Sequence, residues 1–232
     1  MIEYLIDWLL SLKGWPSLLI FVRHGESVGN TQTADERAGF CLATHAYPLT
    51  QRGRTQAKIT GEYLRARFGT PDAYYVSYYK RSRATMELMF PGVKIYEDSR
   101  LAEAQRGIWH TMTKAQIAER FPEEIDRKER EGLYHYRPWG GENWPDVEMR
   151  IHSIRETLRR DYSGKTVYIC GHGAWFNLFQ KDNDRFSIAE ALRRHEEGTV
   201  ENASVTIFEG RRIKGRPRLV MREYIIPWQG RI

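Results

Sequence analysis

Four short polar segments of this chain each follow an apolar stretch, and together they carry two histidines, two arginines and one glutamate. Arg23 and His24 come directly after a run of five apolar residues, and Arg81, Glu103 and His172 follow later apolar segments. The guanidinium of arginine pairs with two phosphate oxygens at once. A neutral histidine can attack phosphorus, and a carboxyl group can carry a proton to a leaving group. These residue types therefore predict phosphoryl transfer.

Each of these residues taken alone has an ordinary structural explanation, because charged side chains near strand ends are usually solvated. The evidence for a shared site is their common position. All five follow segments that are predicted to be strands of one parallel sheet. Open α/β folds bind ligands just beyond the carboxyl ends of such strands.

The segments between these residues alternate between strand and helix patterns. Buried strands are predicted over 18–22, 73–76, 93–96 and 166–170, and β-like runs over 203–208 and 219–226. Helices are predicted over 50–68, 86–90, 113–121, 144–158, 175–179 and 187–194. This alternation favours an α/β fold with three layers, α/β/α, in which the central sheet is mostly parallel and has an antiparallel edge.

The whole chain, 1–232, is interpreted as one domain with two additions. Residues 1–13 carry apolar side chains at helical spacing and are expected to form an amphipathic helix that packs on the domain or on another subunit. The segment 31–46 is expected to be a long loop, and 97–143 an irregular cap over the end of the sheet.

The tetrapeptide Arg23-His24-Gly25-Glu26 resembles the RHG(E) motif of the histidine phosphatase superfamily, in its phosphoglycerate-mutase-like branch. The segment from Ser77 to Thr85 matches the S-x-x-x-R-x-x-x-T pattern of that family. A run characteristic of the family, L-T-x-x-G-x-x-Q-A, is present as Leu49, Thr50, Gly53, Gln56 and Ala57.

This resemblance implies a phosphoglycerate-mutase-like fold and a phosphoric monoester hydrolase of the histidine acid phosphatase type. It implies that His24 forms a phosphohistidine intermediate, while Arg23, Arg81 and His172 hold the phosphoryl group and Glu103 protonates the leaving oxygen. The substrate is expected to contact six further residues, namely Asn30, Gly25, Ser27, Gly173, Tyr134 and Arg137. For Tyr134 and Arg137, packing within an aromatic loop is an equal alternative. The other five histidines are expected to be surface or structural residues, although His45 and His110 lie in loops that could reach the pocket.

Three functions remain open at this point. A phosphatase is favoured over a mutase, because the residues after Glu103 lack the Arg-His-Tyr-Gly run that follows the acid in mutases. The segments 121–124, 134–137 and 141–142 are similar to the bisphosphatase half of 6-phosphofructo-2-kinase/fructose-2,6-bisphosphatase, although Asn143 replaces a serine of that pattern. The third alternative is a non-catalytic member that binds a phosphorylated ligand.

Charge and composition limit the partners. The net charge is +6, but the dense basic cluster Arg211–Arg218 lies between two strand-like runs and is predicted to be a hairpin loop, so no nucleic-acid partner is expected. No membrane partner, cofactor or metal is expected either, since no metal-ligand spacing is present. The two cysteines, Cys41 and Cys170, favour a reducing, cytoplasmic location. The expected partner is a small phosphorylated substrate, and homo-oligomer formation is compatible with the sequence.

Overall fold

The computed structural model describes residues 14–40, 42–198 and 200–232. The helix expected over 1–13 and Cys41 therefore lie outside the described residues. Among the helices of the described residues, none is both long enough and apolar enough to cross a bilayer.

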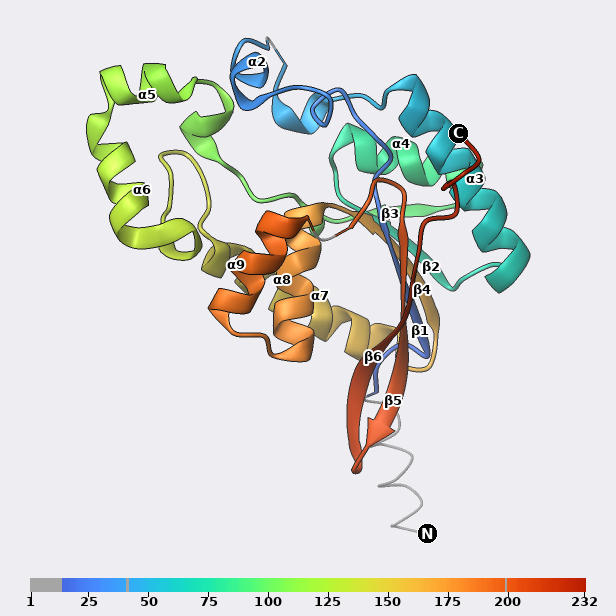
Figure 1. The fold of residues 1–232 in the computed structure, drawn as a ribbon. Coiled ribbons are helices and arrows are strands. Elements are labelled where there is room, and N and C mark those ends of the chain that lie inside the picture. Colours follow the sequence, from blue (N-terminus) through green and yellow to red (C-terminus); the bar gives the residue numbers. More distant parts are fainter. Residues whose placement is uncertain (1–13, 41, 199) are drawn as a thin grey trace.

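A six-stranded sheet with the order β3-β2-β4-β1-β5-β6 forms the middle layer (Figure 1). The strands are β1 (Leu18–Arg23), β2 (Ala73–Val76), β3 (Ile95–Glu97), β4 (Thr166–Gly171), β5 (Val205–Ile213) and β6 (Arg216–Ile225). The pairs β1–β4, β4–β2 and β2–β3 are parallel, whereas β5 is antiparallel to both β1 and β6. The predicted mostly parallel sheet with an antiparallel edge is confirmed.

Helices cover both faces of this sheet (Figure 1). One face carries α3 (Gln51–Phe68) and α4 (Lys80–Met89), and the other carries α7 (Trp144–Asp161) and α8 (Gly173–Asp184), with α9 (Ile188–Glu197) packed beside α8. Two separate hydrophobic clusters fill the spaces between the sheet and these helices. The arrangement is the predicted three-layer α/β/α fold.

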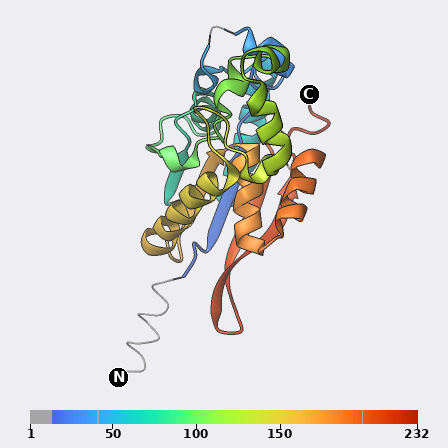
Figure 2. The same cartoon turned by 90° about the vertical axis from the view of Figure 1, so that its left-hand side faces the viewer.

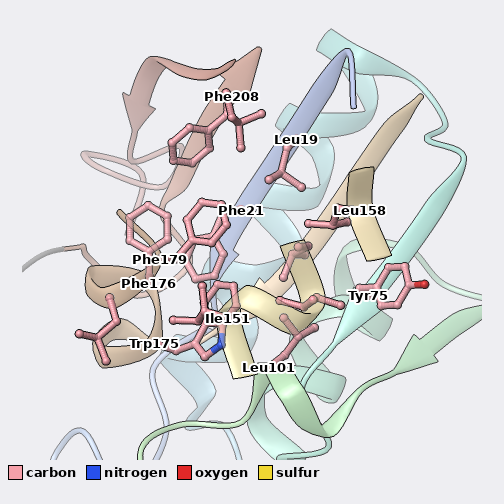
Figure 3. Close-up of a cluster of buried hydrophobic side chains, with 14 of the residues drawn as sticks. Leu19, Phe21, Tyr75, Leu101, Ile151, Leu158, Trp175, Phe176, Phe179 and Phe208 are labelled. Atoms are coloured by element: carbon pink, nitrogen blue, oxygen red, sulfur yellow. The ribbon is translucent and has the colours of Figure 1, made fainter. Parts of the chain in front are cut away.

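Strand β1 shows why an uninterrupted apolar run was needed. Successive side chains of a strand point to opposite faces of a sheet. Leu19 and Phe21 therefore join the cluster under α7 and α8, while Ile20 and Val22 join the cluster under α3 and α4. Figure 3 shows the first of these clusters, in which the ring of Phe21 stacks on that of Phe176 with 4.2 Å between the centroids. Burial of each such side chain contributes about 1.5–3 kcal/mol, which fixes the strand that precedes His24.

The segment 97–143 is more regular than expected. It contains the 3-10 turns η2 (Ser99–Leu101) and η3 (Gly107–His110) and the helices α5 (Lys114–Arg120) and α6 (Pro122–His135). Helix α5 is the one predicted over 113–121, whereas α6 was not predicted, because Pro122 ends one helix and also starts the next. Proline is favoured in the first turn of a helix, and Glu123 and Glu124 follow it where the helix dipole favours acidic residues.

The expected loop over 31–46 also contains helical turns, α2 (Ala34–Ala38) and η1 (Thr44–Ala46). Thr33 and Glu36 form a capping box at the start of α2, and each side chain accepts a hydrogen bond from the other residue's backbone N–H. The sequence carried this signal as a threonine followed three residues later by a glutamate. In Figure 1, α2, α5 and α6 lie beyond one end of the sheet.

The predicted hairpin at the antiparallel edge is present, but its basic residues lie mostly in the strands rather than in a loop. Arg211 pairs with Arg218 in the β5–β6 register, and the turn consists of Lys214 and Gly215 alone. Both turn residues have positive φ angles, 49° and 74°, which suit a two-residue hairpin turn. Figure 2 shows the β5–β6 hairpin extending away from the helices, at the end of the molecule opposite α2 and α5.

Candidate active site

The structure brings together the five residues that the sequence singled out, at the carboxyl ends of the parallel strands. Arg23 is the last residue of β1 and His24 follows it, while Arg81 lies in the first turn of α4, after β2. His172 comes directly after β4, and Glu103 follows the short turn η2 beyond β3. Four of the five line a cavity of about 260 Å³, and the ring of His172 lies behind it, 5.2 Å from that of His24 between centroids.

The ring nitrogens of His24 have different partners. Nδ1 lies 2.7 Å from the carbonyl oxygen of Gly25, and Nε2 lies 3.0 Å from Nε of Arg81. A carbonyl oxygen can only accept and a guanidinium can only donate, so we assign the proton to Nδ1 and the free electron pair to Nε2. Burial holds the pKa of His24 well below 6.5, and the positive charges of Arg81 and Arg23 lower it further. His24 is therefore a neutral imidazole with a nucleophilic Nε2 at neutral pH.

Two buried donors beside His24 have no hydrogen-bond partner among the described residues. They are Nε2 of His172 and Nε of Arg23. Arg81 donates from Nη2 to Nδ1 of His172 at 3.3 Å, which leaves the proton of His172 on Nε2. A buried donor without an acceptor costs about 1–3 kcal/mol. A ligand that brings acceptor oxygens, such as a phosphoryl group, would remove this cost.

Arg81 is a buried cation and Arg23 a partly buried one, and neither forms an ion pair with any residue in the described part of the chain. Burial lowers the pKa of both guanidiniums, and the carboxylate of Glu103 partly opposes this effect. Arg23 donates from Nη1 to the carbonyl oxygen of Val200, and Arg81 donates from Nη1 to that of Thr44 at 2.8 Å. These contacts hold the guanidiniums in place without neutralising them, so the site is electrically suited to a dianion.

Glu103 lies at the N-terminus of α8. Its carboxylate accepts hydrogen bonds from the backbone N–H groups of Ala104, Trp175 and Ala174, at 3.0, 3.1 and 3.3 Å. The first turn of a helix favours negative charge. This turn therefore fixes the carboxylate beside the cavity.

Arg150, which the sequence analysis did not single out, holds the loop that carries Glu103. Its Nη1 donates to the carbonyl oxygens of Arg100 and Ala102 at 3.0 Å each, and its Nε and Nη2 pair with Glu142 at 2.8 Å. Trp175 donates from its indole to the same carbonyl of Arg100 at 2.9 Å. No local sequence signal could reveal this hydrogen-bond network, because its residues come from three distant segments.

The predicted substrate contacts are met in part. Ser27, Asn30 and Gly173 line the cavity, and Oδ1 of Asn30 accepts from both the backbone N–H and the hydroxyl of Ser27. Gly25, also expected to contact the substrate, does not line the cavity, and its N–H donates to the hydroxyl of Thr85 at 3.0 Å. A side chain at Gly25 would come within 2.5 Å of the carbonyl oxygen of Gly53, so close packing explains this glycine.

Tyr134 and Arg137 lie outside both this cavity and the one beside it, and their predicted contact with substrate has to be corrected. The hydroxyl of Tyr134 donates to Glu148 at 2.7 Å, and Arg137 pairs with Asp146. Packing within the aromatic loop, the alternative considered for both residues, describes them better.

Two of the other histidines also line the cavity, one from a loop that was considered able to reach it and one that was not. They are His110 in η3 and His195 in α9. Burial lowers the pKa of both, that of His110 to about 4. Arg37 and Arg106 also line this cavity. Periodicity could not identify these four residues, since they come from the cap and from α2 and α9.

We expect the free energy of unfolding to fall as the pH is lowered from 7.5 to 5.5. His24 and His172 stay unprotonated in the folded protein because burial and Arg81 hold their pKa values well below 6.5. In the unfolded chain each of these histidines binds a proton near pH 6.5. Below that pH, each histidine therefore lowers the free energy of unfolding by up to about 1.4 kcal/mol per pH unit. Urea unfolding at several pH values measures the slope. The double variant His24→Gln/His172→Gln should flatten it and the exposed-site variant His152→Gln should not; an equal slope in all three proteins would contradict this assignment.

In the described part of the chain, no group of three or more histidine, cysteine, aspartate or glutamate side chains is arranged to hold a metal ion. The thiol of Cys170 is buried in β4, where it packs as a small apolar side chain, and burial raises its pKa to about 12.

Comparison with known proteins identifies the family of this chain. Residues 19–222 match the family model of the histidine phosphatase superfamily, branch 1. "Phosphoglycerate mutase-like protein AT74H" of Arabidopsis thaliana is 29% identical over 215 residues, which are 82% of this chain and 73% of that protein. A 2,3-bisphosphoglycerate-dependent phosphoglycerate mutase of Gloeobacter violaceus is 30% identical over 74% of this chain and 77% of its own length.

Two further matches connect the chain to a phosphatase and to a solved structure. A 6-phosphofructo-2-kinase/fructose-2,6-bisphosphatase of Gallus gallus is 29% identical over 67% of this chain, but over only 31% of that protein. The crystal structure of YhfR from Bacillus stearothermophilus superposes with a TM-score of 0.70 at 26% identity, covering 88% of this chain and 96% of that one. The family model spans most of the sequence, and the chain belongs to the histidine phosphatase superfamily.

Proposed function

We propose that this protein is a metal-independent phosphomonoesterase that hydrolyses a small phosphorylated metabolite through a phosphohistidine at His24. The observation that carries the proposal is the surroundings of His24. Its Nε2 is unprotonated, and the donors around it are Arg81 and the two unpartnered groups on Arg23 and His172. Such an arrangement offers a nucleophile and a set of donors to one phosphoryl group.

The first half of the reaction forms the phosphoenzyme. Oxygens of the phosphoryl group take the N–H donors of Arg23, Arg81 and His172, which frees the electron pair on Nε2 of His24. That pair forms the N–P bond while the ester P–O bond breaks and its electrons pass to the leaving oxygen. Glu103 gives a proton to that oxygen as the alcohol departs.

The second half returns the enzyme to its starting state. A water molecule attacks phosphorus and the carboxylate of Glu103 takes its proton. The N–P bond breaks, its electrons return to Nε2 of His24, and inorganic phosphate leaves. The backbone N–H groups at the start of α8 keep Glu103 in one position through both halves.

Phosphate release is the direct test. The purified protein should release phosphate from sugar phosphates, nucleotides, phosphoglycerates or an aryl phosphate in the presence of a chelator. Loss of activity with chelator would contradict the metal-free mechanism. Interconversion of phosphoglycerates without phosphate release, dependent on a bisphosphorylated primer, would establish the mutase function that the Gloeobacter relative's name describes. Binding without turnover would establish a non-catalytic member.

The variant Glu103→Gln should separate substrates by their leaving groups. We expect glycerol phosphate hydrolysis to slow by about 10²–10⁴-fold, because an alkoxide needs a proton as it leaves. Hydrolysis of 4-nitrophenyl phosphate should slow far less, because its phenolate leaves without one. The matched control is Glu97→Gln, an exposed glutamate at the end of β3. Equal slowing of both esters would remove the proton-transfer role from Glu103.

A further inference from the structure

A second cavity, of about 370 Å³, adjoins the catalytic cavity. The two share the lining residues Arg37, Ala104, Arg106, His110, Ala174 and His195. The second cavity continues between η3 and the cap helices α5 and α6. A molecule held by its phosphoryl group at His24 therefore has a continuous space for its other half.

Cations without counterions line this second cavity. Arg106, Lys114 and Lys128 belong to its wall, and none of them forms an ion pair or a side-chain hydrogen bond with a described residue. The pKa of Lys128 is lowered by burial and then by the positive charges of Arg106 and Lys114. These three side chains come from η3's N-cap, α5 and α6, so the fold concentrates positive charge that the sequence spreads over 23 positions.

The acidic residues of the same wall do not neutralise this charge. Glu142 is already held by two hydrogen bonds from Arg150 at 2.8 Å and by the N–H of Gln105. Asp35 is exposed on α2 and forms no ion pair with a described residue. The cavity thus keeps a net positive charge that an anionic ligand group would balance.

Three aromatic side chains lie beside these cations. Trp109, Tyr136 and Trp144 line the cavity. The indole of Trp109 donates to the hydroxyl of Tyr136 at 2.9 Å, and that hydroxyl donates to the buried carboxylate of Glu124 at 2.7 Å. The ammonium of Lys128 lies 4.0 Å from the centroid of the Trp109 ring. The ring planes are therefore fixed by the protein, which suits a planar ligand.

We infer that the second cavity binds the leaving-group half of the substrate, and that the substrate is a phosphomonoester whose alcohol carries a flat ring and a second anionic group. This inference rests on the proposed function for the place of the phosphoryl group. The ring packs on the wall of Trp109 and Tyr136, and the second anion pairs with Lys128 and Lys114. A substrate without that anion leaves both ammonium groups unpaired.

Two synthetic esters that differ only in the second anion provide the test: 2-naphthyl phosphate and 6-carboxy-2-naphthyl phosphate. The wild-type protein should hydrolyse the carboxylated ester with a kcat/KM at least about tenfold higher, mainly through a lower KM. Lys128→Gln and Lys114→Gln should each reduce the ratio of the two kcat/KM values, carboxylated to uncarboxylated ester, severalfold. The matched control is Arg130→Gln, two residues from Lys128 on α6, whose side chain is 69% exposed and lines neither cavity. It should leave the ratio unchanged.

Calorimetric binding of the same esters to His24→Gln, which cannot form the phosphoenzyme, separates this inference from the proposed function. Preferential binding of the carboxylated ester that depends on Lys128 would support the second anion site even if no ester were hydrolysed. Hydrolysis of both esters at equal kcat/KM, with equal binding, would overturn the inference and leave the phosphatase proposal standing. A preference for the uncharged naphthyl ester would also overturn it and would indicate an apolar leaving group.

Discussion

Replacing His24 by alanine is expected to reduce kcat/KM for phosphate esters by at least about 10⁴-fold, equivalent to about 5.5 kcal/mol of transition-state stabilisation. The variant loses the only atom placed to form the N–P bond in the proposed mechanism, Nε2, which lies 3.0 Å from Nε of Arg81. The donors of Arg23, Arg81 and His172 remain, so binding of inorganic phosphate should weaken much less than turnover. Initial rates and phosphate affinity measured on the same preparation check both statements.

The phosphoenzyme itself gives an independent readout of His24. Rapid quenching with labelled substrate should trap a phosphoramidate that acid hydrolyses and alkali preserves, and His24→Ala should abolish it. Because His24 is buried, His24→Gln serves as a second variant in case alanine disturbs packing. His152→Ala, at an exposed histidine paired with Asp182, is the matched control and should retain full activity. Near-normal turnover or labelling in both His24 variants would refute the nucleophile assignment.

The second large effect is expected for Arg81→Met, which should lower kcat/KM by about 10²–10³-fold or more. Arg81 donates hydrogen bonds to three separate segments of the site: to Nε2 of His24, to Nδ1 of His172 and to the carbonyl oxygen of Thr44. Its charge also lowers the pKa of both histidines, so this variant should raise those pKa values. Steady-state rates, together with imidazole titration followed by NMR, measure the two consequences.

Arg83 provides the control for Arg81, because it lies two residues further along the same helix. Its side chain is half exposed and pairs with Glu87 and Glu97 on the surface, and exposed pairs of this kind contribute little. Arg83→Met should therefore change kcat/KM less than about twofold. The kcat/KM of Arg81→Lys should also be strongly reduced, since one ammonium group cannot make the three hydrogen bonds that the planar guanidinium donates to His24, His172 and Thr44. Equal activity of the Arg81 and Arg83 variants would show that Arg81 takes no part in catalysis.

The residues proposed for catalysis and those proposed to bind the leaving group come from different parts of the fold. Arg23, His24 and Arg81 line the cavity at the strand ends, whereas Arg106, Lys114 and Lys128 belong to the cap and its flanking turn. The first group is held by the packed sheet. The second group is held mainly by surface helices, so it can vary while the chemistry stays the same.

The sequence by itself determined the fold class and, through its resemblance to the motifs of the histidine phosphatase superfamily, singled out the five residues that the structure brings together. An unbroken apolar run such as 18–22 can only be buried on both faces, which indicates a parallel strand in the middle of a sheet. The ends of such strands meet at one edge. The order of polar residues along the chain therefore already placed Arg23, His24, Arg81 and His172 together.

Only the tertiary structure decided what depends on contacts between distant segments. The proton of His24 lies on Nδ1 because the chain turns the carbonyl of Gly25 toward it, and Glu103 is fixed because the N-terminus of α8 reaches the loop after η2. The cations Arg106, Lys114 and Lys128 share a cavity because three cap elements fold toward one another. Local patterns encode burial and helix starts, but they do not encode which surface side chains meet across a cavity. The residues proposed to act on the phosphoryl group were therefore readable from the sequence, while those proposed to surround the leaving group were not.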